Sequence, residues 1–270
     1  MTMNDREQAS KKRHLIVTAD DFGLSPEVNE GILKAFFGGI VTTASALVTM
    51  RHAKQAARFV QNIRMPVGLH LDLFEGEFPH DDEGLFGGGG FMEDVLNARE
   101  IRGERISLPS QVSNKIFREF WRQLCEFQDV FGRRPDHLSY HWGIHYIPDV
   151  LESYIRFASE EHIPFRYGAQ YAHVTPTYPI HPDHWSDTFN GAANIHETAF
   201  LDIVRNAPEG IIEISTHPGK YAPDAAYQYN AEREKELEVL MSRNVADALG
   251  EYNVSLISFG HIPELRKNIE

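Results

Sequence analysis

The chain has 270 residues, and 42 % of them are hydrophobic, which is enough for a sizeable core. Its 26 basic and 39 acidic residues give a formal net charge of −13, which repels phosphate backbones and argues against nucleic acid as a partner. The single cysteine, Cys125, rules out an intrachain disulfide, and no segment approaches the roughly 18 apolar residues that a membrane span needs. We therefore expect a cytoplasmic protein with no membrane partner.

Short apolar runs alternate along the chain with longer amphipathic segments. In chain order, the pattern predicts a strand at 15–17, a helix at 26–37, a strand at 44–50, a helix at 53–63, a strand at 67–71, a helix at 112–131, a strand at 137–140, a helix at 148–160, a strand at 164–167, a helix at 195–205, a strand at 211–215, a helix at 231–249 and a strand at 255–258. Ser25 and Pro26 suit the cap and the first residue of the first helix. Cys125 falls within a helical pattern, and we interpret it as a core thiol.

Strands that alternate with helices predict an α/β protein with a mostly parallel sheet. Seven or eight strands in one chain favour a barrel, with an open doubly wound sheet as the alternative. No repeat or linker divides the sequence, so we expect one domain over 1–270, with a flexible segment at 1–13. Two stretches without regular pattern, 74–109 and 168–194, follow predicted strands and would lie over the active face of a barrel.

Two adjacent carboxylates, Asp20 and Asp21, stand where the first apolar run ends. The carboxyl ends of parallel strands are where sites form. Successive side chains of a strand point to opposite faces, but a turn here can bring both into one pocket. One carboxylate could then bind a metal ion while the other accepts a proton. The alternative is a turn or helix-capping pair, which is common for aspartate, and the motif alone does not decide between them.

Three histidines occupy the same position relative to later strands. His70 lies at the end of the third predicted strand, while His141 and His217 come just after two others. A buried, hydrogen-bonded histidine is the more frequent explanation for any one of them. His145 stands four residues after His141 and could pair with it on a helix, but glycine and proline nearby favour a loop.

The coincidence of these positions is more informative than any single one. A parallel barrel gathers the ends of its strands on one face, so the aspartate pair and the three histidines should converge there. One carboxylate and two imidazoles leave metal positions open for water and substrate, which is typical of a catalytic site. A divalent ion in such a site lowers the pKa of a water molecule and polarises a carbonyl.

Four segments resemble motifs of the YdjC-like family, which includes chitooligosaccharide deacetylases. They are TADDFGLS at 18–25, VTTASALVTM at 41–50, GLHL at 68–71 and EISTHPG at 213–219. The resemblance extends from about Leu15 to Phe259. It implies a distorted (β/α) barrel, related to the polysaccharide-deacetylase barrels, that binds one divalent metal ion.

By motif position, the resemblance implies that Asp21, His70 and His141 are the metal ligands. Asp20 matches the residue usually assigned as general base. His217 matches the histidine that acts as acid or supports the leaving group. The implied reaction is therefore hydrolysis of an N-acetyl group from a small sugar or oligosaccharide, in which Asp20 accepts a proton from water and His217 protonates the amine.

The middle motif departs from the family pattern DSHxHxH. Tyr140 or Ser139 stands in place of the leading aspartate, depending on the alignment, and Gly143 replaces the central histidine. The ligand His141 is retained. The changes affect the support of that ligand and the contacts to the substrate.

Further residues could contact the sugar. Arg166 ends a predicted strand and is expected in the same cleft, where it would orient the general base or bind a sugar hydroxyl; the alternative is a surface arginine. Trp142 is expected to bind substrate, and Trp185, Tyr167 and Tyr171 also offer flat faces for sugar rings. Ordinary packing explains any one of these aromatic residues equally well.

Two other functions stay open. One is a different barrel metal hydrolase that acts on another amide or an ester. The other is a non-catalytic carbohydrate-binding protein, which would not need the base Asp20 beside the metal. The ligand set favours Zn²⁺, with Ni²⁺, Fe²⁺ and Mg²⁺ as other candidates. The sequence also leaves open whether the chain forms a homo-oligomer.

Overall fold

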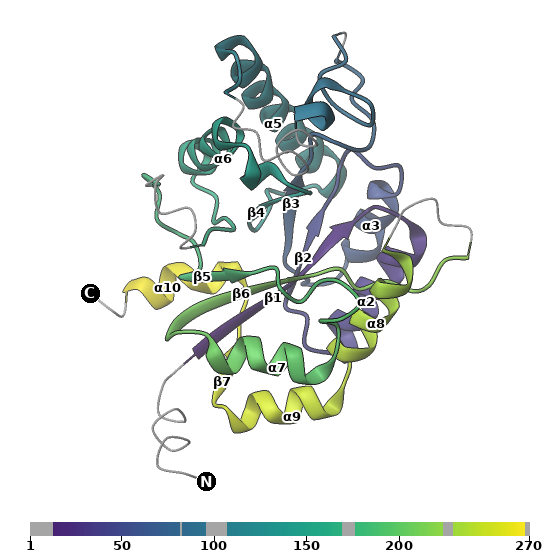
Figure 1. Ribbon diagram of the computed structural model, residues 1–270, viewed down its shortest axis with the longest axis vertical. Helices are drawn as coiled ribbons and strands as arrows, with labels where there is room; N and C mark the ends of the chain where they lie inside the picture. Colours follow the sequence, from purple (N-terminus) through teal and green to yellow (C-terminus); the bar gives the residue numbers. More distant parts are fainter. Residues whose placement is uncertain (1–12, 82, 96–106, 169–175, 224–228, 268–270) are drawn as a thin grey trace.

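The fold is built on one curled sheet of seven strands (Figure 1). The computed structural model describes residues 13–81, 83–95, 107–168, 176–223 and 229–267. The strands are β1 (Arg13–Phe22), β2 (Thr43–Ala46), β3 (Val67–Leu71), β4 (Leu138–Tyr140), β5 (His184–Ser186), β6 (Gly210–Thr216) and β7 (Val254–Leu256). Every strand pairing is parallel, in the order β4-β3-β2-β1-β6-β5, and β7 pairs with the start of β1. β1 is therefore the central strand.

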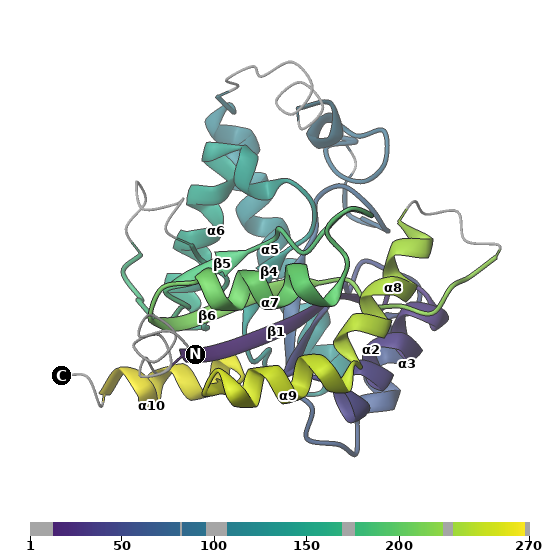
Figure 2. The same cartoon turned by 60° about the horizontal axis from the view of Figure 1, so that its bottom comes forward.

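Helices cover the outer face of this sheet. They are α2 (Pro26–Gly38), α3 (Ala53–Val60), α5 (Ser110–Phe131), α6 (Pro148–Glu161), α7 (Glu197–Asn206), α8 (Asn230–Leu240) and α9 (Arg243–Glu251), and the 3₁₀ turn η1 (Ile144–Tyr146) precedes α6. The 3₁₀ turn η3 (Phe259–His261) and α10 (Ile262–Lys267) instead pack in the smaller apolar cluster that contains Ile16. Figures 1 and 2 show α7 and α9 side by side, α5 packed on α6, and α2 beside α8. Within the described ranges, no helix is long and apolar enough to cross a membrane.

The two ends of the sheet approach each other. Beyond β4, Phe165 makes a single parallel bridge to Leu138, and its N–H donates to the carbonyl of Ile180 (3.2 Å). The rings of Tyr140 on β4 and Trp185 on β5 lie 6.0 Å apart. Irregular backbone thus spans the gap between β4 and β5. The predicted α/β class and the distorted barrel are confirmed.

The side chains of β1 sort into two layers because the strand is buried on both faces. Leu15 and Val17 belong to the main core with the covering helices, whereas Ile16 belongs to a second, smaller apolar cluster. Since side chains alternate along a strand, Thr18 and Asp20 continue the face of Ile16. This interior face therefore changes from apolar to charged toward the carboxyl ends of the strands.

Two predicted elements differ in kind from the structure, and one strand was not predicted. The strand predicted at 164–167 is a single bridge, in part because Pro164 lacks the N–H that a ladder needs. β5 lies inside the stretch 168–194, where no regular element is predicted. The helix predicted at 231–249 is two helices, because Ser242 has an extended backbone and its hydroxyl donates to Glu197.

Two single residues are also corrected. Cys125 is exposed and not a core thiol, because the buried stripe of α5 passes through Leu124 and Phe127 on either side of it. Arg13, expected at the flexible end, is buried as the first residue of β1. Residues 1–12 lie outside the described part of the chain.

Candidate metal centre and catalytic site

Asp20 and Asp21 reach the same pocket although they are consecutive residues of β1. The register between β1 and β2 shifts between Ala19 and Phe22, and Asp21 has a left-handed φ of 69°. Aspartate tolerates this conformation better than most residues. The irregularity interrupts the normal alternation of side chains, so both carboxylates are buried near the same histidine, His70.

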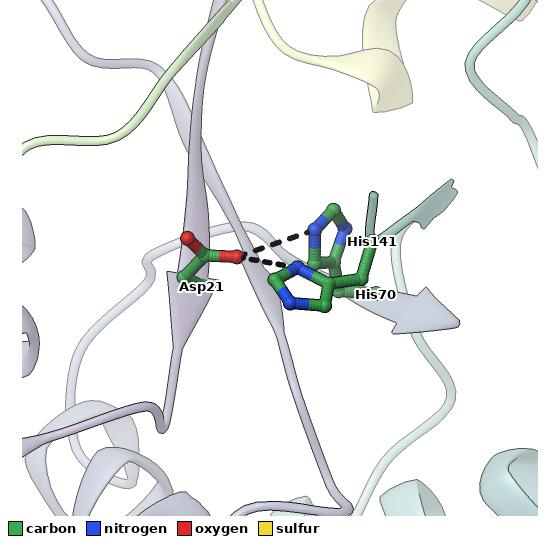
Figure 3. A group of neighbouring side chains, drawn as sticks. All are labelled: Asp21, His70 and His141. Carbon is green, nitrogen blue, oxygen red and sulfur yellow. Dashed lines mark ion pairs between the residues drawn. The ribbon is translucent and has the colours of Figure 1, made fainter. Parts of the chain in front are cut away.

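Asp21, His70 and His141 gather at the ends of β1, β3 and β4 (Figure 3). Asp21 Oδ1 lies 2.9 Å from His141 Nδ1 and 3.5 Å from His70 Nε2. One ligand atom from each residue lies within 4.8 Å of the other two, and all three residues are buried. Asp21 Oδ1 has no hydrogen-bond partner among the described residues. A carboxylate oxygen and two imidazole nitrogens form a donor set that fits a divalent ion.

Each of these histidines has an outer partner on its other ring nitrogen. His70 Nδ1 lies 2.7 Å from Ser139 Oγ, and His141 Nε2 lies 3.5 Å from Glu75 Oε2. Ring N–H groups that donate to these oxygens would leave the lone pairs of His70 Nε2 and His141 Nδ1 directed toward Asp21. Histidines that bind metals almost always have such a partner, which fixes the tautomer. Ser139 and Glu75 thus offer support in a motif that lacks the family's aspartate.

The pocket stabilises positive charge. Burial alone would lower the pKa of His141, but Asp21, together with Glu75, raises it to about 10. Burial lowers the pKa of His70 below 6.5, which favours a neutral ring with a lone pair to share. Burial would raise the pKa of Asp21, yet Arg233 and His141 hold it well below 3.8. An ionised carboxylate and a neutral imidazole therefore stand where a cation is favoured.

Asp20 lies beside this group, and Arg166 holds both of its oxygens. Arg166 Nη1 and Nη2 donate to the two oxygens of Asp20 at 2.8 and 3.0 Å, while Nε and Nη2 donate to Glu213 Oε1 at 2.9 and 2.8 Å. Burial would raise the pKa of Asp20, but Arg166 holds it below 3.8; burial raises the pKa of Glu213 above 4.5. Arg166 is only 2 % exposed, which favours the alternative in which it orients Asp20 over direct contact with a sugar hydroxyl.

His217 directly follows β6, and its side chain is 26 % exposed. Its backbone N–H donates to Glu236 Oε2 (2.6 Å), and its Nδ1 lies 3.7 Å from Glu236 Oε1. The hydroxyl of Tyr229 donates to the same Oε1 (2.6 Å). Burial alone would lower the pKa of His217, but Glu236 raises it above 6.5, which favours the protonated ring. His217 is therefore equipped to donate a proton.

The aromatic residues predicted to contact sugar differ in their surroundings. Trp142 is 55 % exposed, has a left-handed φ of 51°, and its ring centre lies 5.8 Å from that of the preceding histidine. Trp185 is partly buried, and its ring lies 5.6 Å from the guanidinium of Arg166. Tyr167 is buried in the core. Tyr171 lies outside the described residues.

His145 is not part of the group of possible ligands. It lies in η1, where its ring packs against Tyr146 and Trp185 with ring centres 4.0 and 5.6 Å away. Burial lowers its pKa to about 4. The alternative in which His141 and His145 share one helical face does not hold.

The profile of the family described as YdjC-like protein matches residues 14–251. The chain belongs to the YdjC-like family. It is 32 % identical over 255 residues to a chitooligosaccharide deacetylase of Yersinia enterocolitica, a match that covers 91 % of this chain and 97 % of that protein.

Solved structures of low sequence identity share the fold. A protein of Enterococcus faecalis V583, named as a candidate cellobiose-phosphate cleavage protein, is 24 % identical with a TM-score of 0.76, and the match covers 92 % of this YdjC-like chain and 98 % of that one. A variant of the peptidoglycan deacetylase PdaC from Bacillus subtilis is 14 % identical with a TM-score of 0.50, covering 97 % and 94 %. The expected likeness in fold to the polysaccharide-deacetylase barrels is confirmed.

Five polar residues that contact the site of this YdjC-like protein were not predicted as site residues. They are Glu75, Ser139, Glu213, Arg233 and Glu236. The sequence pattern could have indicated Glu213, because it is a lone charge in an otherwise apolar strand. No sequence pattern could have indicated Arg233 and Glu236, since they lie among many other charged residues on α8.

Proposed function

We propose that this YdjC-like protein is a metal-dependent hydrolase that removes an N-acetyl group from a small sugar or oligosaccharide. One observation carries the proposal: a group of three possible ligands shares a buried pocket with a further carboxylate, Asp20, which Arg166 holds separately. A pure binding site has no need of that second carboxylate. The Yersinia relative, named a chitooligosaccharide deacetylase, supports an acetylated amino sugar as the substrate.

We assign the place of one divalent ion to Asp21, His70 and His141. The mixed oxygen and nitrogen ligands favour Zn²⁺, while Ni²⁺, Fe²⁺ and Mg²⁺ are weaker candidates. An ion held there would polarise the acetyl carbonyl and lower the pKa of a water molecule. Ser139 and Glu75 keep the two imidazoles in the orientation that this requires.

The remaining residues of the site move protons. Asp20 accepts a proton from the attacking water as general base, and Arg166 keeps Asp20 ionised and correctly oriented. His217 donates a proton to the departing amine. Glu236 holds the backbone of His217 and favours its protonated form.

Trp142 is proposed to contact the sugar ring. The possible ligands are nearly closed off from solvent, whereas Trp142 beside them is largely exposed. In this proposal the acetamide group reaches the ligands, while the sugar ring stays at the surface beside Trp142. The left-handed backbone of Trp142 is a strained conformation for a tryptophan, and such strain is found at binding sites.

Acetate release tests the proposed function. The purified protein is stripped with a chelator and then assayed with and without added Zn²⁺, Ni²⁺, Fe²⁺ or Mg²⁺. The substrates are N-acetylglucosamine and its β-1,4-linked dimer and trimer, an O-acetylated sugar, and an N-acetylated amino acid. We expect metal-dependent acetate release from the N-acetylated sugars.

The other outcomes select the alternatives. Release from the ester or the amino acid, but not from the N-acetylated sugars, would identify a different metal hydrolase. Binding of the sugars, measured by calorimetry, without acetate release under any metal condition would identify a carbohydrate-binding protein.

A further inference from the structure

Arg233 reaches the proposed metal ligand from a distant helix. It lies in the first turn of α8, is 5 % exposed, and donates from Nη2 to Asp21 Oδ2 at 2.6 Å. The two residues are 212 positions apart in the sequence. Nothing in the charged pattern of α8 distinguishes Arg233 from its neighbours, yet its guanidinium reaches the buried carboxylate of Asp21.

The two oxygens of Asp21 face different partners. Oδ1 faces His70 and His141, whereas Oδ2 is held by Arg233. A carboxylate bonded in this way cannot rotate freely or turn its second oxygen toward the histidines. Because the left-handed backbone of Asp21 alone does not fix the side-chain torsion, Arg233 selects the orientation that presents one oxygen.

The chain makes room for this arginine. A β-carbon at Gly219 would lie 3.2 Å from Cβ and 3.3 Å from Cδ of Arg233, and the N–H of Gly219 donates to the carbonyl of Arg233 (3.1 Å). A β-carbon at Gly31 would lie 2.5 Å from Cα of Gly219. These two glycines permit α2, α8 and the loop after β6 to approach closely, so the stem of Arg233 is fixed along with its guanidinium.

The same helix also supports the proposed acid. Arg233 Nη1 lies 3.5 Å from the carbonyl oxygen of His217, and Glu236, three residues later on α8, binds the N–H of His217. α8 therefore contacts the proposed ligand and the proposed acid through consecutive turns of one rigid element.

We propose that Arg233 is a positioning residue that holds Asp21 Oδ2, so that Asp21 offers one oriented oxygen to the metal ion. A planar guanidinium suits this role because its donors are fixed in direction, whereas a lysine ammonium is a point charge on a flexible stem. The inference rests on the metal centre proposed above and not on the identity of the substrate.

Zinc affinity tests the proposal without reference to activity. Metal-stripped wild type and the variants Arg233→Gln, Arg233→Lys and Arg205→Gln are titrated with Zn²⁺ by calorimetry, and folding is checked by circular dichroism and thermal unfolding. Loss of a partner that orients a ligand typically weakens metal binding about 10–100-fold, and we expect this for Arg233→Gln. Arg233→Lys should recover part of the loss. Arg205 pairs with Asp202 on α7 and serves as the matched control, with unchanged affinity.

A merely structural role would lower the melting temperature and leave zinc affinity unchanged, and that result in folded Arg233→Gln would overturn the proposal. If Arg233→Gln does not fold, Arg233→Lys decides, and zinc affinity equal to wild type would overturn it. Acetate release is measured in parallel. A wild type that binds zinc but releases no acetate contradicts the proposed function and leaves the role of Arg233 standing, whereas a wild type that binds no zinc overturns both the metal centre and this inference.

Discussion

Two buried histidines four residues apart, His137 and His141, differ in how they hold a proton. Burial lowers the pKa of His137 to about 3, whereas neighbouring carboxylates raise the pKa of His141 to about 10. Both residues are almost inaccessible, at 0 % and 7 % exposed. Burial therefore does not explain the difference, and the surrounding residues must.

The direct contacts of the His137 ring are with neutral side chains. Ser45 Oγ lies 2.9 Å from its Nε2 and Thr43 Oγ1 lies 3.5 Å from its Nδ1, while its ring stacks on Phe259 at 4.1 Å. Hydroxyl groups do not offset the cost of burying a charge, and Arg166 opposes protonation further. The interior of the barrel thus has a neutral layer that supports the fold and a charged layer at the strand ends.

Within the charged layer, the largest effect is expected from Asp20→Asn. The substitution removes the proposed base and should lower the rate of acetate release by about 10²–10⁴-fold. Metal should stay bound, because Asp21, His70 and His141 persist. Acetate release and elemental analysis measure the two halves of this prediction, and full activity in the variant would remove Asp20 as the base.

Asp21→Asn should act on the metal instead. It removes the carboxylate that faces both histidines, so we expect zinc affinity to fall by more than about 100-fold, beyond the range for outer partners. Activity should fall with metal content and return in part at high zinc. Full metal occupancy in this variant would show that Asp21 is wrongly assigned as a ligand. The two aspartate variants would then no longer differ in metal content.

A smaller effect is expected from the outer partners of the two histidines. Glu75→Gln and Ser139→Ala each leave the three proposed ligands in place but weaken the orientation of one ring. We expect a loss of about 10-fold in zinc affinity, at the low end for such partners. Glu77→Gln is a control for Glu75→Gln, because Glu77 is exposed and pairs with Arg51. Unchanged zinc affinity in both variants would mean that these contacts do not support the site.

The regular part of the fold could be predicted from local sequence. β3 has the predicted bounds because a continuous apolar run is typical of a strand buried on both faces. α2 begins as predicted, since Ser25 accepts a hydrogen bond from Val28 N–H and Pro26 follows it. β5 was missed because it has only three residues, is partly buried, and follows a proline.

The candidate site could be predicted only in part. Its carboxylates and histidines follow apolar runs, so their convergence follows from parallel topology. Arg233, Glu236 and Glu75 could not be found in this way, because their partners lie far away in sequence. Charged residues are spread around α8 with no apolar face, a pattern that is typical of a solvated helix. Which charges turn inward depends on the packing of α8 against α2, which no local pattern reports.

In the neutral layer the expected effect is on stability and not on metal binding or rate, because His137 makes stability depend on pH. Because the folded pKa of His137 is about 3 and the ordinary value is 6.5, the unfolded chain binds one more proton between these limits. Stability is therefore fully present above about pH 6.5 and is lost as the pH falls toward 3, by about 1.4 kcal/mol per pH unit. His137→Gln carries no titrating ring, and its amide can still bond to Ser45. The free energy of unfolding of metal-stripped wild type and variant is measured by urea unfolding between pH 7 and 4. Plotted against pH, it should fall more steeply for the wild type, and the two slopes should differ by this amount. Equal slopes of the free energy of unfolding against pH would mean that His137 is protonated in the folded chain. The difference between the neutral and charged layers would then be absent.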